Sequence, residues 1–237
     1  GAGFLPIGNS DVKFTGEYNG NSKIIDSLLI NRPTEDFIVL FVRVEGSTAR
    51  IDNLGLTNLQ ITGRRYVGGI VGYLLEATVN QSFTKGSINN TNSPDWWAKL
   101  GGIVGQNSGI ISSCFSFVDI TSPKSMLGGL VGSNYNGEIK NSYSRGSVTG
   151  TGSGRVGGLV GDNNNSVITN CYSSAVVTCS DYATGGLIGY EEGTVNNSFW
   201  DIEVSGVDNS FGGIGLSTIE MMKMINFNKI QINKKKK

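Results

Sequence analysis

The 237-residue chain balances 19 Lys and Arg against 19 Asp and Glu, but five lysines fall at 229 and 234–237, so the rest is mildly acidic. A mildly acidic body lacks the clustered basic side chains that a nucleic-acid backbone requires, and we expect no nucleic-acid partner. Histidine is absent, which excludes Ser-His-Asp and Cys-His nucleophile systems and every histidine-containing zinc site.

Residues 1–65 lack a repeat and carry large apolar side chains, including the run Phe-Ile-Val-Leu-Phe-Val at 37–42. We expect them to form a cap and the less regular first coils of the array that follows, because stacked strands otherwise expose an unpaired edge. The chain starts with Gly1 and contains neither a signal peptide nor an apolar stretch of about 18 residues. We therefore expect a piece of a larger protein, with no direct membrane insertion in this segment.

One pentapeptide, Gly-Gly-(Ile or Leu)-(Val or Ile)-Gly, recurs through residues 66–216. Its five copies lie at 68–72, 101–105, 128–132, 157–161 and 185–189, and a shortened copy follows at 212–215. The second glycines of the five copies are 33, 27, 29 and 28 residues apart. A period of about 28 residues is typical of a solenoid. We expect the glycines to permit positive φ and close backbone approach at the corners.

A second segment follows each pentapeptide, with an aliphatic residue, two polar residues, a small residue and an aromatic one. Its copies lie at 79–83, 111–115, 139–143, 168–172 and 195–199, and remnants of a third apolar segment include Ile88 and Val204. These segments are too short for helices and are rich in strand-forming residues. Parallel stacking about 4.8 Å apart places like residues above like. It predicts an interior aliphatic column (Ile70, Ile103, Leu130, Leu159, Leu187) and an aromatic column (Phe83, Phe115, Tyr143, Tyr172, Phe199).

The pentapeptide followed by Ile-x-Asn-(Ser or Cys)-(Phe or Tyr) resembles the GLUG repeat. This repeat occurs in large secreted and cell-surface proteins of bacteria and archaea, and beside the peptidase region of some immunoglobulin-A-cleaving metalloproteases. The resemblance extends from Val67 to about Leu216. It implies an all-β fold, a right-handed parallel β-helix (β-solenoid) of roughly six to eight coils. It also implies display outside the cell, without shared catalytic residues or a cofactor.

The longest spacing between pentapeptides reflects an inserted connection at 89–100, which contains Asp95, Trp96 and Trp97. Aromatic rings stack on sugars and anchor protein interfaces. Insertions into solenoid repeats also often mark the binding face. These three residues are therefore candidate ligand-binding residues, and the alternative is that the tryptophans cover the edge of a coil.

Asp162, Asn163 and Asn164 offer oxygen atoms of the kind that calcium accepts. The run lacks the alternating acidic pattern and the downstream acidic ligand of a calcium loop, and Asn-rich turns have the same composition. Asn89 and Asn164 also begin Asn-x-(Ser or Thr) patterns in expected loops, so both are candidate N-glycosylation sites. The acidic residues fall at different phases of the repeat, and we predict no metal or catalytic site.

Polar residues recur two positions before the aromatic of the second segment, at Asn53, Gln81, Ser113, Asn141, Asn170 and Asn197. Stacked amides can bond to one another along the axis, which predicts a structural ladder rather than a ligand-reading surface. Cys114 and Cys171 occupy the small position two coils apart, about 9.6 Å, which exceeds the roughly 7 Å limit for a disulfide. We expect free buried thiols, and a bridge between Cys171 and Cys179 remains the alternative.

Residues 217–237 close the chain. Ser217 and Glu220 have capping-box spacing before the apolar Met221 and Met222, which predicts a short capping helix. We expect the lysines beyond it to be a solubilising end or a truncation artefact, and the alternative is a binding tail.

These features favour a non-enzymatic stalk or adhesive module of a secreted or cell-surface protein. Its partner would be a glycan or protein of a host or neighbouring cell, bound through the inserted loop. The first alternative is a self-assembling subunit of a surface layer or extracellular filament, whose partners are copies of itself. A carbohydrate-active β-helix enzyme is the second alternative.

Overall fold

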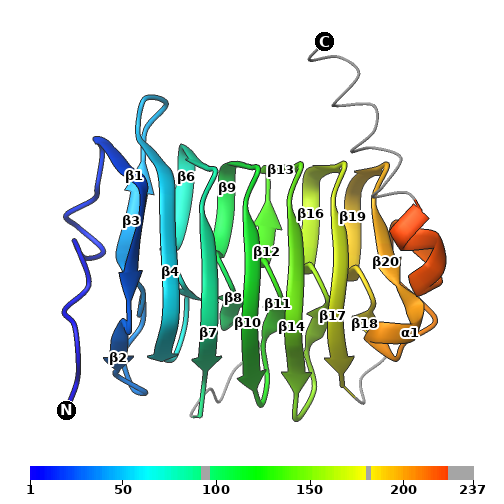
Figure 1. The fold of residues 1–237 in the computed structure, drawn as a ribbon. Helices are drawn as coiled ribbons and strands as arrows, with labels where there is room; N and C mark the ends of the chain where they lie inside the picture. Colours follow the sequence, from blue (N-terminus) through cyan, green and yellow to red (C-terminus); the bar gives the residue numbers. More distant parts are fainter. Residues whose placement is uncertain (92–96, 180–182, 224–237) are drawn as a thin grey trace.

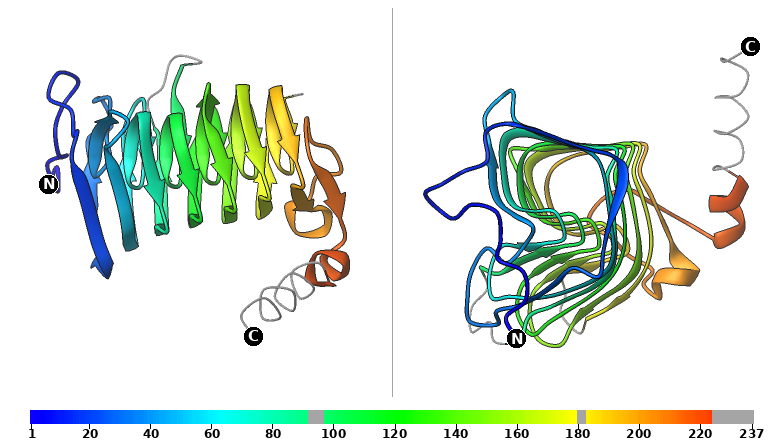
Figure 2. Two further views of the ribbon diagram at one scale, coloured as in Figure 1. Left: turned by 90° about the horizontal axis from the view of Figure 1, so that it is seen from above. Right: turned by 60° about the vertical axis from the view of Figure 1, so that its left-hand side comes forward.

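The computed structural model describes residues 1–91, 97–179 and 183–223. The chain winds into a parallel β-solenoid of about six coils, and the sheets run along its length (Figure 1). All pairings between its strands are parallel. Seen close to the axis, the stacked coils superimpose and enclose a narrow interior (Figure 2). The predicted β-solenoid fold is confirmed.

Two long faces and one short face make up each coil. The first long face contains β6 (Val71–Asn80), β9 (Val104–Ser112), β12 (Val131–Tyr135), β13 (Glu138–Lys140), β16 (Val160–Thr169) and β19 (Ile188–Asn196). The second contains β7 (Phe83–Asn89), β10 (Phe115–Ser122), β14 (Tyr143–Gly150), β17 (Tyr172–Thr178), β20 (Phe199–Asp201) and β21 (Ile214–Leu216). The short face is a separate sheet of β5 (Val67–Gly68), β8 (Lys99–Gly101), β11 (Met126–Gly128), β15 (Arg155–Gly157) and β18 (Thr184–Gly185).

The N-terminal region already contains stacked strands. They are β1 (Glu17–Asp26), β2 (Leu29–Asn31), β3 (Phe41–Glu45) and β4 (Arg50–Thr62). The long strand β4 turns the corner between the two long faces, because its first residues pair with β6 and its later residues pair with β7. β1 pairs with β4. Parallel stacking therefore begins well before the first pentapeptide.

The predicted aliphatic column lies inside the solenoid, and its five members are fully buried. The aromatic column lies on the outside, where its rings are half-buried. Successive rings from Phe83 to Tyr172 are stacked with nearly parallel planes, and their centroids are 4.9, 5.1 and 4.7 Å apart. Because each ring covers the face of the next, this column stabilises the stack and leaves little ring face for a ligand.

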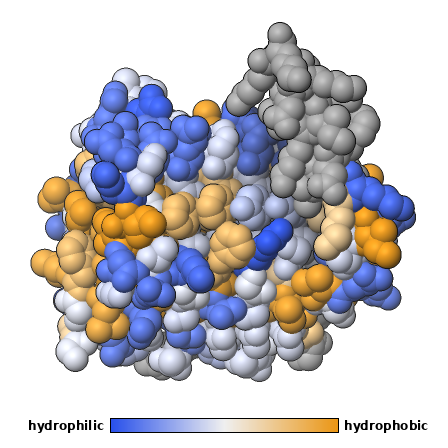
Figure 3. Space-filling view, viewed as in Figure 1, coloured by the Kyte–Doolittle hydropathy of each residue, from blue (hydrophilic) through white to orange (hydrophobic). Residues whose placement is uncertain are grey.

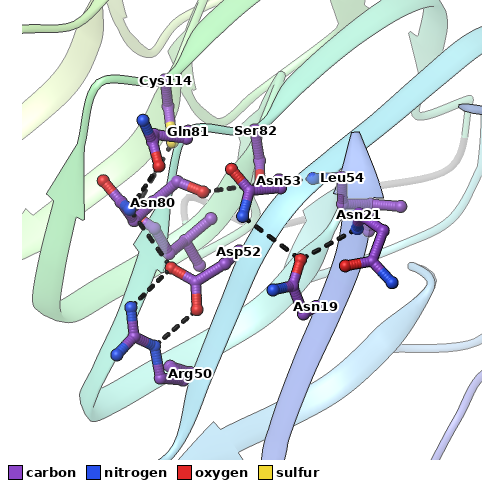
Figure 4. Close-up of polar contacts among 11 residues, drawn as sticks. Asn19, Asn21, Arg50, Asp52, Asn53, Leu54, Asn80, Gln81, Ser82 and Cys114 are labelled. Carbon is purple, nitrogen blue, oxygen red and sulfur yellow. Dashed lines mark hydrogen bonds and ion pairs between the residues drawn. The ribbon is translucent and has the colours of Figure 1, made fainter. Parts of the chain in front are cut away.

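Positive φ occurs at the amide ladder and not at the pentapeptide glycines, which corrects the expectation from sequence. The six ladder residues have φ between 44° and 55°, whereas none of the glycines in the five full pentapeptides has positive φ. Asn favours this conformation because its short side chain bonds locally. Figure 4 shows the start of the ladder, where Asn53 Nδ2 donates to Asn19 Oδ1 at 3.2 Å. The pentapeptide glycines instead permit close packing: a Cβ on Gly129 would lie 2.2 Å from the Gly158 carbonyl oxygen.

The small position of the second segment links consecutive coils. Ser142 Oγ accepts from the Cys114 amide at 3.1 Å, and Ser198 Oγ accepts from the Cys171 amide at 3.1 Å. Cys114, Cys171 and Cys179 are all free thiols, and the first two are buried. The free-thiol expectation is confirmed, without the alternative bridge between Cys171 and Cys179.

A second amide ladder lies inside the solenoid. Asn107 Nδ2 donates to Asn134 Oδ1, and Asn134 Nδ2 donates to Asn163 Oδ1, both at 2.7 Å. Asn163 Nδ2 then donates to both carboxylate oxygens of Glu191 at 3.0 Å. Every amide of this ladder donates to the next coil in the direction of the C-terminus. The last member therefore has to accept a hydrogen bond without a further coil to donate to, and an ionised carboxylate, which only accepts, satisfies this. Burial raises the pKa of Glu191, against the effect of the Asn163 bond.

The C-terminal end contains two helical segments. α1 (Ile202–Ser205) is capped by Asp201, whose side chain accepts from the Val204 amide. Val204 therefore lies in a helix rather than in the expected strand remnant, because Asp201 and Gly206 cap a single turn. The predicted capping helix is present from residue 218 to 223. Its capping box is formed, with the Ser217 amide donating to Glu220 at 2.9 Å and the Glu220 amide donating to Ser217 at 3.4 Å.

Candidate functional site

A groove of about 480 Å³ runs along the corner between the short face and the first long face. Its short-face wall contains Trp97, Lys99, Met126 and Arg155, and its long-face wall contains Gln106, Ser133, Tyr135, Asp162 and Asn164. The volume falls within the range of about 300–1,000 Å³ that is common for small-molecule sites. Register aligns Lys99, Met126 and Arg155 across β8, β11 and β15.

Strand alternation explains why these side chains meet in the groove. Leu100 of β8 is fully buried, so its strand neighbour Lys99 points outward, and Trp97 lies exposed in the turn just before the strand. Asn134 is fully buried between Ser133 and Tyr135, and it belongs to the interior amide ladder. The interior ladder therefore fixes the long-face wall from behind.

Polar contacts hold the two walls together on either side of Met126. Lys99 Nζ donates to Gln106 Oε1 at 2.7 Å and lies 4.8 Å from the centre of the Tyr66 ring. Burial lowers the pKa of Lys99, and the nearby Asp162 acts in the opposite direction. The ammonium of Lys99 is thus partly shielded from water by the groove wall.

The equivalent contact two coils further on is an ion pair. Arg155 donates to Asp162 Oδ1 at 2.5 Å, and its guanidinium lies 4.0 Å from the centre of the Tyr190 ring. Burial raises the pKa of Asp162, while the charge of Arg155 acts against this shift. The middle coil has only Met126 and Ser133 at the corresponding positions, and this leaves space in the groove.

Two aromatic side chains in the groove are open to solvent. Trp97 is 65% exposed and Tyr135 is 47% exposed. By contrast, Tyr66, Tyr73 and Tyr190 each have a cation over the ring. Trp97 and Tyr135 therefore have ring surface available for a ligand.

The structure separates the residues predicted from sequence. Trp97 lines the groove, whereas Asp95 and Trp96 lie outside the described residues. Asp162, Asn163 and Asn164 do not converge on one point, because Asn163 faces the interior and the other two face outward. Within the described ranges, no group of three or more acidic or cysteine side chains is placed to hold a metal ion.

The two candidate glycosylation sites do not lie in loops, contrary to the expectation from sequence. Asn89 is the last residue of β7 and pairs with Thr121 of β10. Asn164 lies within β16, and its Nδ2 donates to Glu192 at 2.7 Å. Both were misplaced because the strands extend beyond the β-branched residues from which strands are inferred.

Sequence reasoning missed Lys99, Tyr135 and Arg155 as groove residues. What they share is their place in the inside-outside alternation of the strands. Each follows a buried residue and therefore points outward, into a wall of the same corner. The corner becomes visible only when the register between coils is known.

Two comparisons by sequence relate the chain to known proteins. Residues 125–149 match the family described as the GLUG motif. Halomucin of Haloquadratum walsbyi is 36% identical over 107 residues, which is 45% of this chain and 1% of halomucin. A "Putative Gly-rich membrane protein" of Evansella cellulosilytica is 31% identical over 118 residues, which is 47% of this chain and 10% of that protein. The chain thus spans a small fraction of each relative.

A solved structure shares the fold. It is described as a "putative immunoglobulin A1 protease" from Bacteroides ovatus, and it aligns with a TM-score of 0.69 at 20% identity over 86% of this chain and 70% of that one. At this identity the likeness concerns the fold alone. In the part of the chain that the structure describes, no helix is long and apolar enough to cross a membrane. The stacked coils, their pentapeptide corners and the match at 125–149 together show that the chain is a parallel β-solenoid carrying the GLUG motif.

Proposed function

We propose that this chain is a non-enzymatic binding module of a secreted or cell-surface protein, and that it holds a glycan in the groove lined by Trp97 and Tyr135. The observation that carries the proposal is the pair of exposed aromatic rings, Trp97 just before β8 and Tyr135 at the end of β12, beside hydrogen-bonding groups of Gln106, Ser133 and Asn164. Sugars present apolar ring faces and hydroxyl groups, and this combination of aromatic and polar side chains suits both.

The chemistry of the groove favours binding over catalysis. Among the described residues that line it, Asp162 is the one carboxylate, and Arg155 engages it. Glycoside hydrolysis ordinarily uses two carboxyl groups on opposite sides of the scissile bond. The described lining of the groove supplies one carboxylate, which is engaged, and no second one.

The relatives support a location at the cell surface. One of them is named as a membrane protein, and the match covers 10% of its length. A short module within a much longer protein fits a stalk or binding unit, whose extended sheet presents the groove along one side.

The direct test is a glycan array followed by calorimetry on any oligosaccharide that binds. We expect Trp97→Ala and Tyr135→Ala to weaken binding about tenfold or more each, in line with the loss of an aromatic anchor. Phe4→Ala is the matched control, because Phe4 is an exposed aromatic residue far along the chain from the groove. Failure of every glycan to bind, or equal losses in all three variants, would reject the groove as the site.

A second candidate function is end-to-end association into a filament. Hydrophobic residues are exposed at both ends of the array (Figure 3), including Leu5, which is 72% exposed, and Ile214, which is 57% exposed. Strand edges and apolar side chains of this kind invite stacking of a second copy. Light scattering across a hundredfold range of concentration tests this, and a constant monomer mass would reject it.

A further inference from the structure

Lys99 is the charged group of the groove that forms no ion pair with a described residue, although the charge of Asp162 lies near enough to act on it. Its ammonium donates to the neutral amide oxygen of Gln106. No carboxylate of the described residues lies within ion-pair distance of Lys99, whereas Arg155 is paired with Asp162. An ammonium has three donors; one bonds Gln106 and the ring of Tyr66 covers another side of the ammonium, so a donor remains for a ligand.

The position of Lys99 relative to the open rings restricts the ligand further. Trp97 lies in the turn before β8 and Lys99 is the first residue of β8, and both side chains line the groove on either side of the buried Ala98. A sugar that stacks on Trp97 therefore has a substituent within reach of Lys99. The neighbouring coil supplies Ser133 and Tyr135 on the opposite wall.

Charge is unevenly distributed along the groove. At the Lys99 end the lining contributes a positive charge that donates to a neutral amide, and at the other end Arg155 and Asp162 form an ion pair. Glu192 lies one coil beyond, where Asn164 and Tyr190 donate to it. An anionic group is therefore favoured at the Lys99 end and disfavoured toward Glu192.

We propose that the ligand is an acidic glycan whose uronic acid carboxylate accepts hydrogen bonds from Lys99, while the sugar rings contact Trp97 and Tyr135. This proposal rests on the proposed function and specifies its substrate class. The carboxylate gives Lys99 a charged hydrogen-bond acceptor in addition to the neutral amide of Gln106. Bonds between two charged groups are stronger than those between neutral groups, so the charge of the sugar decides between otherwise similar glycans.

The test compares a galacturonic acid oligosaccharide with its fully methyl-esterified form, which has the same rings without the charge. Calorimetry on the wild-type protein should show about tenfold tighter binding of the acid, since a hydrogen bond to a charged group contributes on that order. Lys99→Gln should abolish the preference, so that the acid and the ester bind with equal affinity. Lys85→Gln is the matched control, because Lys85 is an exposed lysine on the second long face.

The outcomes separate the two proposals. Equal binding of acid and ester that still depends on Trp97 would overturn the acidic-glycan inference and leave glycan binding in place. A preference that persists in Lys99→Gln, or that falls equally in Lys85→Gln, would overturn the role of Lys99. Absence of binding by both forms would overturn the inference, and the glycan array would then decide on the proposed function.

Discussion

The interior amide ladder should make Asn134 one of the most sensitive positions for stability. Replacing Asn134 by Leu keeps a similar volume but removes both ladder bonds. The Nδ2 of Asn107 then loses its 2.7 Å acceptor, and the Oδ1 of Asn163 loses its 2.7 Å donor. A buried polar group left unpaired costs about 1–3 kcal/mol, and a hydrogen bond contributes about 1 kcal/mol net. Asn163 Oδ1 is left unpaired, whereas Asn107 Nδ2 keeps longer contacts with the carbonyls of Gly109 and Glu138 at 3.3 and 3.4 Å, so we expect a loss of about 2–4 kcal/mol. That is a large part of the roughly 5–15 kcal/mol of a typical domain.

Urea unfolding followed by circular dichroism measures this loss. Asn164→Ala is the control, because Asn164 lies on the same long face, next to Asn163 in β16, but its side chain faces outward. Its free energy of unfolding should fall by no more than about 1 kcal/mol. The unfolding slopes must be compared, since a lower slope in one variant indicates that coils unfold separately.

A triple variant tests whether unpaired amides, rather than lost hydrogen bonds, cause the loss of stability. Replacing Asn107, Asn134 and Asn163 together by Leu removes donors and acceptors at once, and the combined loss should be smaller than the sum of the single losses. A loss below about 1 kcal/mol for Asn134→Leu alone, or equal to that of the control, would refute the view that unpaired amides dominate.

Three further predictions concern the corner, the thiols and the end of the ladder. Gly129→Ala should cost about 3 kcal/mol or more in urea unfolding, because its Cβ would lie 2.2 Å from the Gly158 oxygen. Gly16→Ala, whose nearest atom would be 3.8 Å away, should cost little. Burial raises the pKa of Cys114 to about 12, so this thiol should resist alkylation at neutral pH until the protein unfolds, and labelling in the native state would contradict the fold. Burial also raises the pKa of Glu191 above its ordinary 4.5. The folded protein therefore keeps this proton to higher pH than the unfolded chain, and the resulting stability, present below 4.5, is lost as pH rises through the folded pKa. Glu191→Gln should remove that part of the pH dependence, and an unchanged curve would contradict this assignment.

Much of the fold was predictable because the repeat itself encodes it. The pentapeptide period indicated stacked coils, and the burial of Ile70 and Leu130 follows from their equivalent positions. The capping box at Ser217 was predictable because its bonds are local. Sequence patterns were sufficient wherever the contacts of a residue lie within its own coil.

Prediction failed where the outcome depends on the neighbouring coil or on turn chemistry. Asn134 resembles a surface residue in sequence, and only the register with Asn107 and Asn163 shows that three amides satisfy one another inside. Positive φ was expected at glycine and occurs at residues such as Asn141. There the short amide stabilises the left-handed corner, while the glycines serve close packing.

The candidate site was predicted only through Trp97. Tyr135 comes from the next coil, and Arg155 from the coil after that, so their meeting with Trp97 depends on the angle between two faces. No spacing in the sequence contains that angle. The aromatic column shows the converse, because a conspicuous row of rings is stacked face to face and is structural.

The location of the ligand tests the central claim most directly. Backbone amide shifts of isotopically labelled protein can be followed by NMR during titration with the tightest-binding oligosaccharide from the array. The groove account predicts that the largest changes occur at Trp97, Lys99, Ser133, Tyr135 and Arg155. Changes confined to the aromatic column from Phe83 to Tyr172, or to the two ends of the solenoid, would contradict it.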